Sequence, residues 1–255
     1  MSTLNIDGVN IYYQVHGSGV PIVFIHPPLL TSINFTYQIQ GLSSSFQTIV
    51  FDIRGHGNSS YSKEPFTYPL ISKDIIHILD HLEIDKAIIC GYSTGGSIAL
   101  DFMITYPGRA LGAILFGPMS EVNDWVLKKE ISLAVMLSNN KTLEPLALAI
   151  CFANSNNKKI FWDLYREAIK GNAKNIKQYY RYSMKYNCTA QLNRIKLPVL
   201  LLYGEKDKLF HPYAHLINQK LPNNELVFVK NVKHQLPTKV AMEVNHLIKQ
   251  FINKL

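Results

Sequence analysis

The sequence of 255 residues predicts an α/β fold: a mostly parallel sheet of eight strands, flanked by helices and interrupted by a helical insertion. Short β-branched apolar runs at residues 21–25 and 48–52 are typical of strands that are buried on both faces. Segments with helical periodicity separate such runs, and helices between strands imply parallel pairing with helices on both sides of the sheet. Strand-like runs are absent from residue 119 to residue 193, which indicates the helical insertion.

The elements before the insertion follow from local patterns. Residues 6–15 are predicted to form an antiparallel hairpin that ends at the glycine-rich segment 16–19. The helix expected over residues 68–82 carries a single buried stripe of apolar side chains. Pro107 and Gly108 end the helix expected over residues 93–106. The other expected elements in this half are a helix over 31–43 and strands over 87–90 and 110–116.

The strand pattern resumes after the insertion. Strands are expected over residues 197–203 and 225–229, with helices near 213–219 and over 239–251. We therefore expect a core formed by residues 1–118 and 194–255, and a helical cap, or lid, formed by residues 119–193. The cap is rich in aromatic residues and contains both tryptophans.

The net charge of +8 is spread along the chain. Residues 1–117 carry −3, whereas residues 118–193 and 194–255 carry +5 and +6, with no run of five or six lysines or arginines. Zinc-finger spacing, glycine–arginine tracts and RNP-type aromatic strands are absent from the sequence. This pattern favours a solvated basic surface, and we expect no nucleic-acid partner.

The composition predicts a soluble, cytoplasmic protein. No apolar run approaches the roughly 18 residues that span a bilayer, so no stable membrane insertion is expected. The first ten residues lack the basic and apolar regions of a secretory signal. Cys90, Cys151 and Cys188 are odd in number and widely spaced, which argues against a disulfide framework, and Cys90 is expected in the core. The sequence leaves the oligomeric state open.

The segment Gly91–Tyr92–Ser93–Thr94–Gly95 matches the pattern G-x-S-x-G between a predicted buried strand and a predicted helix. A nucleophile elbow needs this strand–turn–helix setting, because the turn holds its serine in strained geometry. The simpler interpretation is that Ser93 is an ordinary helix N-cap. The residues downstream favour a nucleophile.

A serine hydroxyl needs a base, and the base needs a third group to orient it. Asp207 follows the strand over residues 197–203, and His234 follows the last predicted strand. Both therefore lie at the same edge of the sheet as Ser93, in the chain order serine, acid, histidine. Glu205 is a rival for the acid, although the Gly-x-x-Asp spacing favours Asp207. His26 and His56 are interpreted as structural loop residues.

The chain resembles the α/β-hydrolase family with a helical cap, over residues 6–251. Besides GYSTG, the resemblance rests on DIRGHGNS at residues 52–59, GEKD at residues 204–207, and His26–Pro27 after the third strand. It implies a serine hydrolase in which Ser93 attacks, His234 transfers the proton and Asp207 steadies the imidazolium. Lys233 departs from the usual glycine before the histidine.

The resemblance also implies an oxyanion hole with two N–H donors. One is the backbone N–H of Thr94, and the other normally comes from a loop that here reads Pro27–Pro28. Proline has no N–H, so we expect Leu29 to donate instead, in a turn preset by the two prolines, for which a cis bond is one route. A side chain such as that of Tyr92, or a hole with a single donor, are the alternatives.

The leading hypothesis is hydrolysis of a carboxylic ester of a small to medium apolar small-molecule substrate, without metal or cofactor. Neither the pair His77 and His81 nor the pair His211 and His215 has a third ligand nearby in the sequence. The alternatives are cleavage of a carbon–carbon bond or a lactone, and a low-turnover receptor of the same fold. The residues expected to contact substrate are Pro28, Tyr92, Trp125, Phe161 and Trp162.

Overall fold

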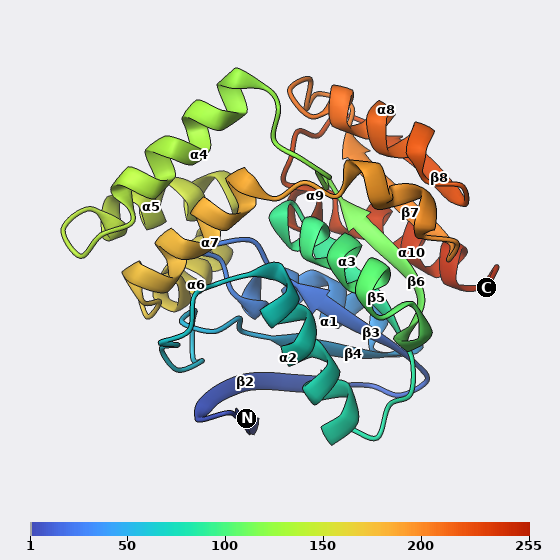
Figure 1. Cartoon of the computed structure of the whole chain (residues 1–255), viewed down its shortest axis with the longest axis horizontal. Helices are drawn as coiled ribbons and strands as arrows, with labels where there is room; N and C mark the ends of the chain where they lie inside the picture. The colour runs from blue at the N-terminus through green and yellow to red at the C-terminus, as the bar shows by residue number, and fades with distance from the viewer. Residues whose placement is uncertain (1) are drawn as a thin grey trace.

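The computed structural model describes residues 2–255, which form one eight-stranded sheet between two layers of helices (Figure 1). The strand order is β1-β2-β4-β3-β5-β6-β7-β8; β1 and β2 are antiparallel to their neighbours, and the other pairings are parallel. The strands are β1 (Ser2–Ile6), β2 (Val9–His16), β3 (Val20–Ile25), β4 (Phe46–Phe51), β5 (Ala87–Tyr92), β6 (Ala110–Phe116), β7 (Val199–Gly204) and β8 (Asn224–Val229). The predicted fold class is confirmed.

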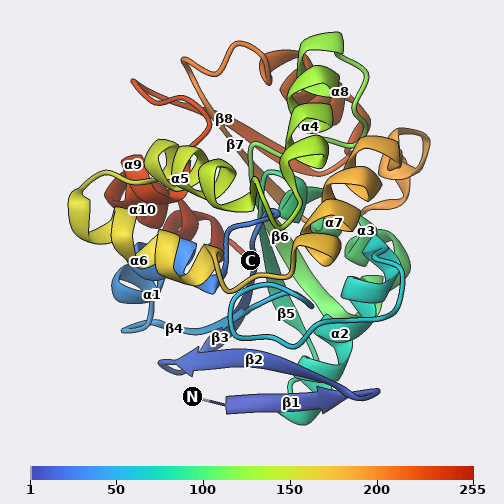
Figure 2. The ribbon, with the colours of Figure 1, turned by 90° about the vertical axis from the view of Figure 1, so that its left-hand side faces the viewer.

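Helices cover both faces of the sheet. Figure 2 shows α1 and α10 on one side and α2 and α3 on the other, with the central strands between them. The helices of the core are η1 (Ser32–Phe35), α1 (Thr36–Leu42), α2 (Tyr68–His81), α3 (Thr94–Thr105), η2 (Pro107–Arg109), α8 (His211–Lys220), α9 (Leu236–Lys239) and α10 (Ala241–Ile252). Apart from Val20, Pro21 and Leu111 near the strand starts, the apolar side chains of β3, β5, β6 and β7 are buried between these layers, because the strands are covered on both faces.

Two expected helices are interrupted. The helix expected over residues 31–43 is a 3-10 turn, η1, followed by α1. The C-terminal helix begins later than expected, at Ala241, and the short α9 precedes it. Pro237 lies in the first turn of α9, where its missing N–H leaves no hydrogen bond unmade.

Four further helices and a 3-10 segment lie between β6 and β7, in the region expected to form the cap. They are α4 (Trp125–Leu137), α5 (Leu143–Asn154), α6 (Lys158–Ala168), α7 (Ala173–Lys185) and η3 (Thr189–Arg194). Helices α4 to α7 lie together beyond the sheet edge where β3 and β5 end (Figures 1 and 2). Their action as a separate lid stays a prediction.

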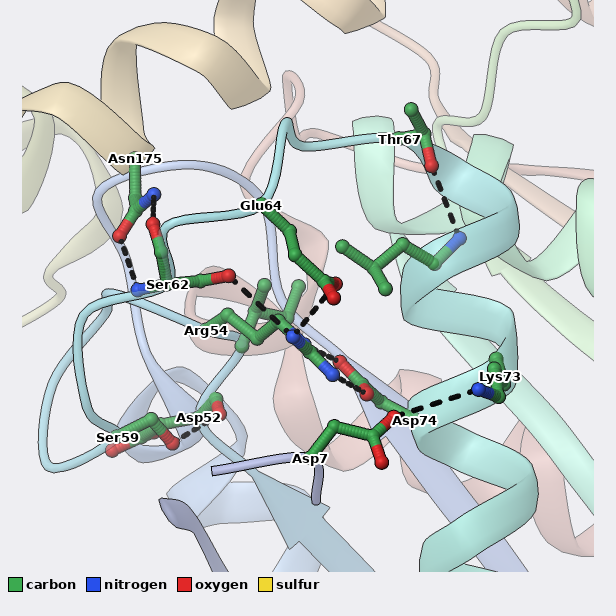
Figure 3. A network of polar contacts seen from close by, with 12 residues as sticks. Asp7, Asp52, Arg54, Ser59, Ser62, Glu64, Thr67, Lys73, Asp74 and Asn175 are labelled. Carbon is green, nitrogen blue, oxygen red and sulfur yellow. Dashed lines mark hydrogen bonds and ion pairs between the residues drawn. The ribbon is translucent and has the colours of Figure 1, made fainter. Parts of the chain in front are cut away.

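Helix α7 is attached to the core by buried hydrogen bonds. The Tyr179 hydroxyl donates to the backbone oxygen of His26 at 3.0 Å, and the ring stacks on Phe66 with centroids 4.3 Å apart. Asn175 accepts from the Ser62 N–H at 3.0 Å and donates to the Ser62 carbonyl at 2.9 Å (Figure 3). Tyr179 and Asn175 are both buried, so these contacts hold α7 in one position on the core.

A buried ion pair joins the loop after β4 to α2 (Figure 3). Arg54 donates from Nε to Asp74 Oδ2 at 2.6 Å and from Nη2 to Asp74 Oδ1 at 2.7 Å, and both side chains are almost fully buried. Glu64 adds a longer contact from the surface. The two parallel hydrogen bonds fix the direction in which the loop leaves the sheet.

Removing one partner of this buried pair is expected to destabilise the protein strongly. Asp74→Leu leaves the buried Arg54 guanidinium with only its longer contact to the exposed Glu64, and should lower the free energy of unfolding in urea by about 3–5 kcal/mol. The exposed pair Asp7–Lys73 is the control, and Lys73→Met, on the same helix as Asp74, should cost at most about 1 kcal/mol. The double variant Arg54→Met/Asp74→Leu should be more stable than Asp74→Leu alone. Equal losses for the two single variants would contradict this interpretation of the ion pair.

Candidate active site

Ser93 lies in a sharp turn between β5 and α3. Its backbone is left-handed, with φ at 55° and ψ at −120°. Such a conformation costs a non-glycine residue about 1–3 kcal/mol, so the surrounding structure has to hold it in place. The Ser93 N–H donates to the Phe116 carbonyl at 2.8 Å, which ties the turn to the end of β6.

The glycines of the GYSTG motif are required by close packing. A Cβ atom on Gly91 would collide with the carbonyl of Gly95, and one on Gly95 would collide with the carbonyl of Ile25 in β3. A Cβ atom on Gly96 would likewise lie too close to Pro118. The first turn of α3 can therefore lie against β3 and β5 only without side chains at these positions.

Asp207 and His234 come together from the ends of neighbouring strands. Asp207 follows β7 and His234 follows β8, and His234 Nδ1 lies 2.8 Å from Asp207 Oδ2. An ionised carboxylate only accepts, so Nδ1–H donates and the lone pair of the neutral ring is on Nε2. Nε2 is buried and has no hydrogen-bond partner within residues 2–255. The histidine is thus oriented with a free acceptor nitrogen.

Three neighbours hold the imidazole ring of His234. The Phe210 ring lies 4.0 Å from it between centroids, and the Tyr92 ring lies 5.3 Å away. Gly117, which has a φ of 53°, lies so close that a Cβ atom there would be 2.7 Å from Cε1. The ring therefore has little freedom to rotate away from Asp207.

Glu205, the rival acid, does not contact His234. Its side chain is exposed, and Oε2 accepts the backbone N–H of Asn231 at 3.2 Å. The Asp207 side chain is only 10% exposed. The geometry therefore agrees with the choice of Asp207 over Glu205.

A cavity of about 160 Å³ is lined by Ser93, Thr94 and His234. Pro28 and Tyr92, two of the residues predicted to contact substrate, also line it. The rest of the lining is mainly apolar and comes largely from the region between β6 and β7: Pro27, Leu30, Met119, Leu127, Ile131, Ile150, Asn154, Tyr180 and Phe210. Helices α4, α5 and α7 thus supply much of the wall above Ser93.

The three aromatic residues predicted as substrate contacts in the cap do not line this cavity. Trp125 is 64% exposed at the start of α4, with the Lys129 ammonium 4.4 Å from its ring centroid. Phe161 and Trp162 border a separate surface hollow on the other side of α5, together with Phe152. Their placement does not support contact with a substrate at Ser93. The sequence pattern did not reveal this, because the packing of each cap helix decides which of its side chains face the cavity.

Sequence analysis missed the residues of the cap that do border the cavity. Asn154 accepts a hydrogen bond from the Tyr92 hydroxyl at 3.0 Å and donates to the Ile150 carbonyl at 2.9 Å. Tyr180 neighbours Tyr179, the residue that attaches α7 to the core. No local motif marks Asn154 or Tyr180, because their role depends on how α5 and α7 rest on the core.

The loop after β3 turns at Leu29, which has a φ of 70°. No peptide bond within residues 2–255 is cis, so the possible cis bond in the Pro27–Pro28 segment is not present. The left-handed backbone of Leu29 makes the turn instead. Pro28 and Leu30 border the cavity, whereas the Leu29 side chain is fully buried.

His26 is hydrogen-bonded to this loop, and the His56 ring packs against the His26 ring, with centroids 5.3 Å apart. His26 Nε2 accepts the Ile53 N–H at 2.9 Å, so its Nδ1–H donates to the Pro27 carbonyl, also at 2.9 Å. Burial lowers the pKa of His26 to about 4, and burial together with the nearby His26 lowers the pKa of His56 to about 3. Both rings are therefore neutral at pH 7, in agreement with their interpretation as structural residues.

No cluster of three or more histidine, cysteine, aspartate or glutamate side chains suited to a metal ion occurs in the described part of the chain. Cys90 is fully buried in β5, which confirms its predicted place in the core. None of the helices within residues 2–255 is both long enough and apolar enough to cross a membrane.

Residues 40–239 match the family described as "Serine aminopeptidase, S33". The matched segment covers most of the chain and includes Ser93, Asp207 and His234. The chain belongs to this family of α/β-hydrolases. It is a hydrolytic enzyme, as the resemblance in its motifs implied.

Similar proteins extend over nearly the whole hydrolase. The protein YisY of Bacillus subtilis, an AB hydrolase superfamily protein, is 26% identical over 96% of each chain. The bifunctional esterase/perhydrolase DCH of Acinetobacter calcoaceticus is 25% identical over 96% of this chain and 97% of its own. The 3-oxoadipate enol-lactonase 2 of Acinetobacter baylyi is 24% identical over 94% of each. The structure of an esterase from Exiguobacterium antarcticum superimposes with a TM-score of 0.88 at 18% identity, covering 97% of each chain, which shows the shared fold.

The buried histidine His56 predicts an acid-dependent loss of stability in this hydrolase. Its pKa of about 3 lies below the ordinary value near 6.5, so between these pH values the unfolded chain binds a proton that the folded chain does not. The free energy of unfolding should therefore fall by about 1.4 kcal/mol per pH unit for this residue as the pH is lowered from about 6.5.

His56→Phe keeps an aromatic ring and removes this titration. Urea unfolding between pH 6 and pH 4 should show a slope that is shallower by about 1.4 kcal/mol per pH unit in the variant. Burial raises the pKa of Asp52 and so acts in the opposite direction, but this carboxyl is present in both proteins and cancels in the difference. Identical slopes would show that His56 is protonated in the folded enzyme.

Proposed function

We propose that this enzyme cleaves carboxylic esters of small to medium apolar small molecules through an acyl-enzyme on Ser93. The observation that carries the proposal is the arrangement of His234: Asp207 holds its Nδ1, its Nε2 has no hydrogen-bond partner in the described part of the chain, and the residue lines the same cavity as Ser93. A serine on a strained turn, an oriented neutral imidazole and a buried carboxylate together make a nucleophile, a base and an orienting group.

In the first half of the reaction, Ser93 Oγ bonds to the ester carbonyl carbon and its proton passes to His234 Nε2. The resulting imidazolium donates its Nδ1–H to the Asp207 carboxylate, which stabilises the positive charge. When the bond between the carbonyl carbon and the alcohol oxygen breaks, His234 Nε2 returns the proton to that oxygen. The alcohol leaves, and the acyl group remains on Ser93.

Water completes the cycle by the same route. His234 Nε2 takes a proton from the water as its oxygen bonds to the acyl carbon, and the bond from that carbon to Ser93 Oγ then breaks. The proton passes from His234 to Ser93 Oγ, so the acid leaves and the enzyme returns to its initial state. No cofactor is needed at any step, because both steps are acyl transfers between oxygen atoms.

Two backbone N–H groups are proposed to hold the developing oxyanion. Thr94 is the first residue of α3, so its N–H has no carbonyl partner within the helix and lies at the positive end of the helix dipole. Pro27 and Pro28 have no N–H to offer, and we assign the second donor to Leu29, at the left-handed turn. Loss of one such donor typically lowers kcat by about 10²–10³.

The lining of the cavity favours a neutral, apolar substrate. None of its fourteen lining residues is an aspartate or glutamate, whereas the amino terminus of a peptide carries a positive charge that needs a partner when buried. An ester has no such charge. The relative from Acinetobacter calcoaceticus, named as an esterase, supports the same substrate class.

Lactone hydrolysis is the second candidate. A lactone is a cyclic ester, so Ser93, His234 and Asp207 would open it by the same steps and retain the alcohol on the acyl chain. The relative named 3-oxoadipate enol-lactonase 2 favours this reaction. Parallel assays on linear p-nitrophenyl esters and on lactones of matched carbon number distinguish the two candidates.

Ser93 is expected to be the only residue labelled by a small fluorophosphonate. Mass spectrometry should find one adduct on the wild-type enzyme at Ser93 and none on Ser93→Ala, which should also lose ester hydrolysis. The variant should unfold at nearly the same urea concentration as the wild type, because a single small hydroxyl contributes little to stability. Full activity in folded Ser93→Ala would rule out the proposed mechanism.

A crystal structure of the labelled enzyme tests the oxyanion hole separately. The phosphonyl oxygen should lie within hydrogen-bond distance of both the Thr94 and the Leu29 nitrogen atoms. A contact with Thr94 alone would exclude Leu29 as a donor and leave the nucleophile assignment unchanged.

The contrast between Asp207 and Glu205 tests the orienting carboxylate. Asp207→Asn keeps the shape of the side chain but cannot accept Nδ1–H with a full negative charge, and kcat should fall by about 10⁴. Glu205→Gln makes the same chemical change on an exposed neighbour and should change kcat by less than about twofold. The opposite result would transfer the role to Glu205.

A further inference from the structure

A second apolar hollow, of about 290 Å³, adjoins the cavity that contains Ser93. We call them the outer hollow and the inner cavity. Four residues line both of them: Leu127, Ile131, Ile150 and Tyr180. The two spaces are therefore neighbours, and these four side chains form the wall between them.

The outer hollow lies between helices of the inserted region. Helix α4 supplies one side and α5 the other, and Tyr180 of α7 belongs to the wall that is shared with the inner cavity. The residues that line only the outer hollow are Glu130, Leu133, Ala134, Leu137 and Leu146. Glu130 is the one charged group among them and is exposed, while Leu133 is 51% exposed at the rim.

We propose that the outer hollow binds the distal part of a linear acyl chain whose carbonyl carbon is attached to Ser93. The inference rests on the proposed function and specifies its substrate as a medium-chain acyl ester. The chain runs from Ser93 past Leu127, Ile131 and Tyr180 and extends toward Leu133 and Leu137. The occupant is a neutral hydrocarbon chain, because almost every group in its path is apolar.

The position of His234 indicates that the acyl group, not the alcohol, follows this route. The leaving alcohol takes its proton from His234 Nε2 and must therefore remain beside that ring. The aromatic rings that pack on His234 are those of Tyr92 and Phe210, and neither residue lines the outer hollow. The path into the outer hollow thus leads away from the site of the leaving group.

The size of the effect follows from the transfer of methylene groups out of water. Each buried methylene contributes about 0.8 kcal/mol, which corresponds to about a fourfold rise in kcat/KM. With only the inner cavity, kcat/KM would stop rising at a short acyl chain. With both spaces in use, it continues to rise over several further carbons.

The test is a series of p-nitrophenyl esters from acetyl to dodecanoyl, in which only the acyl chain changes. Ala134→Phe fills the outer hollow from α4. Ala134 is 9% exposed and lines the outer hollow but not the inner cavity. Met136→Phe is the matched control, because Met136 is on the same helix, is 63% exposed and lines neither space. Leu133→Trp, at the exposed rim, is a second blocking variant that does not depend on repacking a buried position.

Wild-type kcat/KM should rise from butyryl to about decanoyl. Ala134→Phe and Leu133→Trp should each lower kcat/KM for the decanoyl ester by about 16-fold or more, the value of roughly two buried methylenes. The butyryl ester, and the rate of labelling by a small fluorophosphonate, should remain within about twofold in both variants. Met136→Phe should resemble the wild type on all substrates.

Two different failures can be separated. The acyl route is wrong, and the proposed function stands, in two cases in which the butyryl ester and the fluorophosphonate still react. In the first, wild-type kcat/KM falls for acyl chains longer than butyryl. In the second, both blocking variants behave as Met136→Phe does. If no ester is cleaved and Ser93 is not labelled, the proposed function itself fails.

Discussion

The turn at Ser93 is the constraint on which the other features of the site depend. Its left-handed backbone lets the chain reverse from β5 into α3 within one residue, and places Ser93 at the cavity with the first turn of α3 behind it. Gly91 and Gly95 are needed because the carbonyls of α3 and β3 occupy the space of their side chains. Since Asp207 and His234 also follow parallel strands, all three groups meet at the edge where those strands end. A larger residue at either glycine would separate the helix from the sheet and displace Ser93.

A buried carboxylate connects the loops beneath this edge. Asp52 accepts the N–H of Ser32 at 2.8 Å and the N–H of Asn58 at 2.9 Å, so it joins the loop after β3 to the loop after β4. Gly57 allows this approach, because a Cβ atom there would collide with Asp52 Oδ2. Arg54 then fixes the second loop to α2 through Asp74. The DIRGHGNS motif thus supports the turn at Leu29, although none of its side chains lines the cavity.

The inserted helices are attached to the core next to the candidate catalytic groups. Tyr179 donates to the carbonyl of His26 and accepts from the hydroxyl of Thr94, and Tyr92 donates to Asn154 of α5. Tyr92 and Thr94 are the residues on either side of Ser93 in the chain. A displacement of α5 or α7 would therefore break buried hydrogen bonds beside the nucleophile, so the shape of the cavity and the geometry of the turn depend on one another.

Local signals in the sequence were sufficient for the fold class and for the residues brought together at the sheet edge. Buried strands are recognisable by their apolar runs, and the carboxyl ends of parallel strands necessarily meet at one edge, so Ser93, Asp207 and His234 could be placed without coordinates. The Gly-x-x-Asp spacing favoured Asp207 over Glu205, and the structure adds the contact to His234 that distinguishes two residues of one loop. The tertiary structure alone decided the cavity wall: Trp125 and Trp162 are exposed, while Leu127, Ile131, Asn154 and Tyr180 border the cavity. Helical periodicity shows which side chains share a face, but the direction of that face is set by how each helix packs, as Tyr179 and Asn175 do for α7 by attaching it to the core.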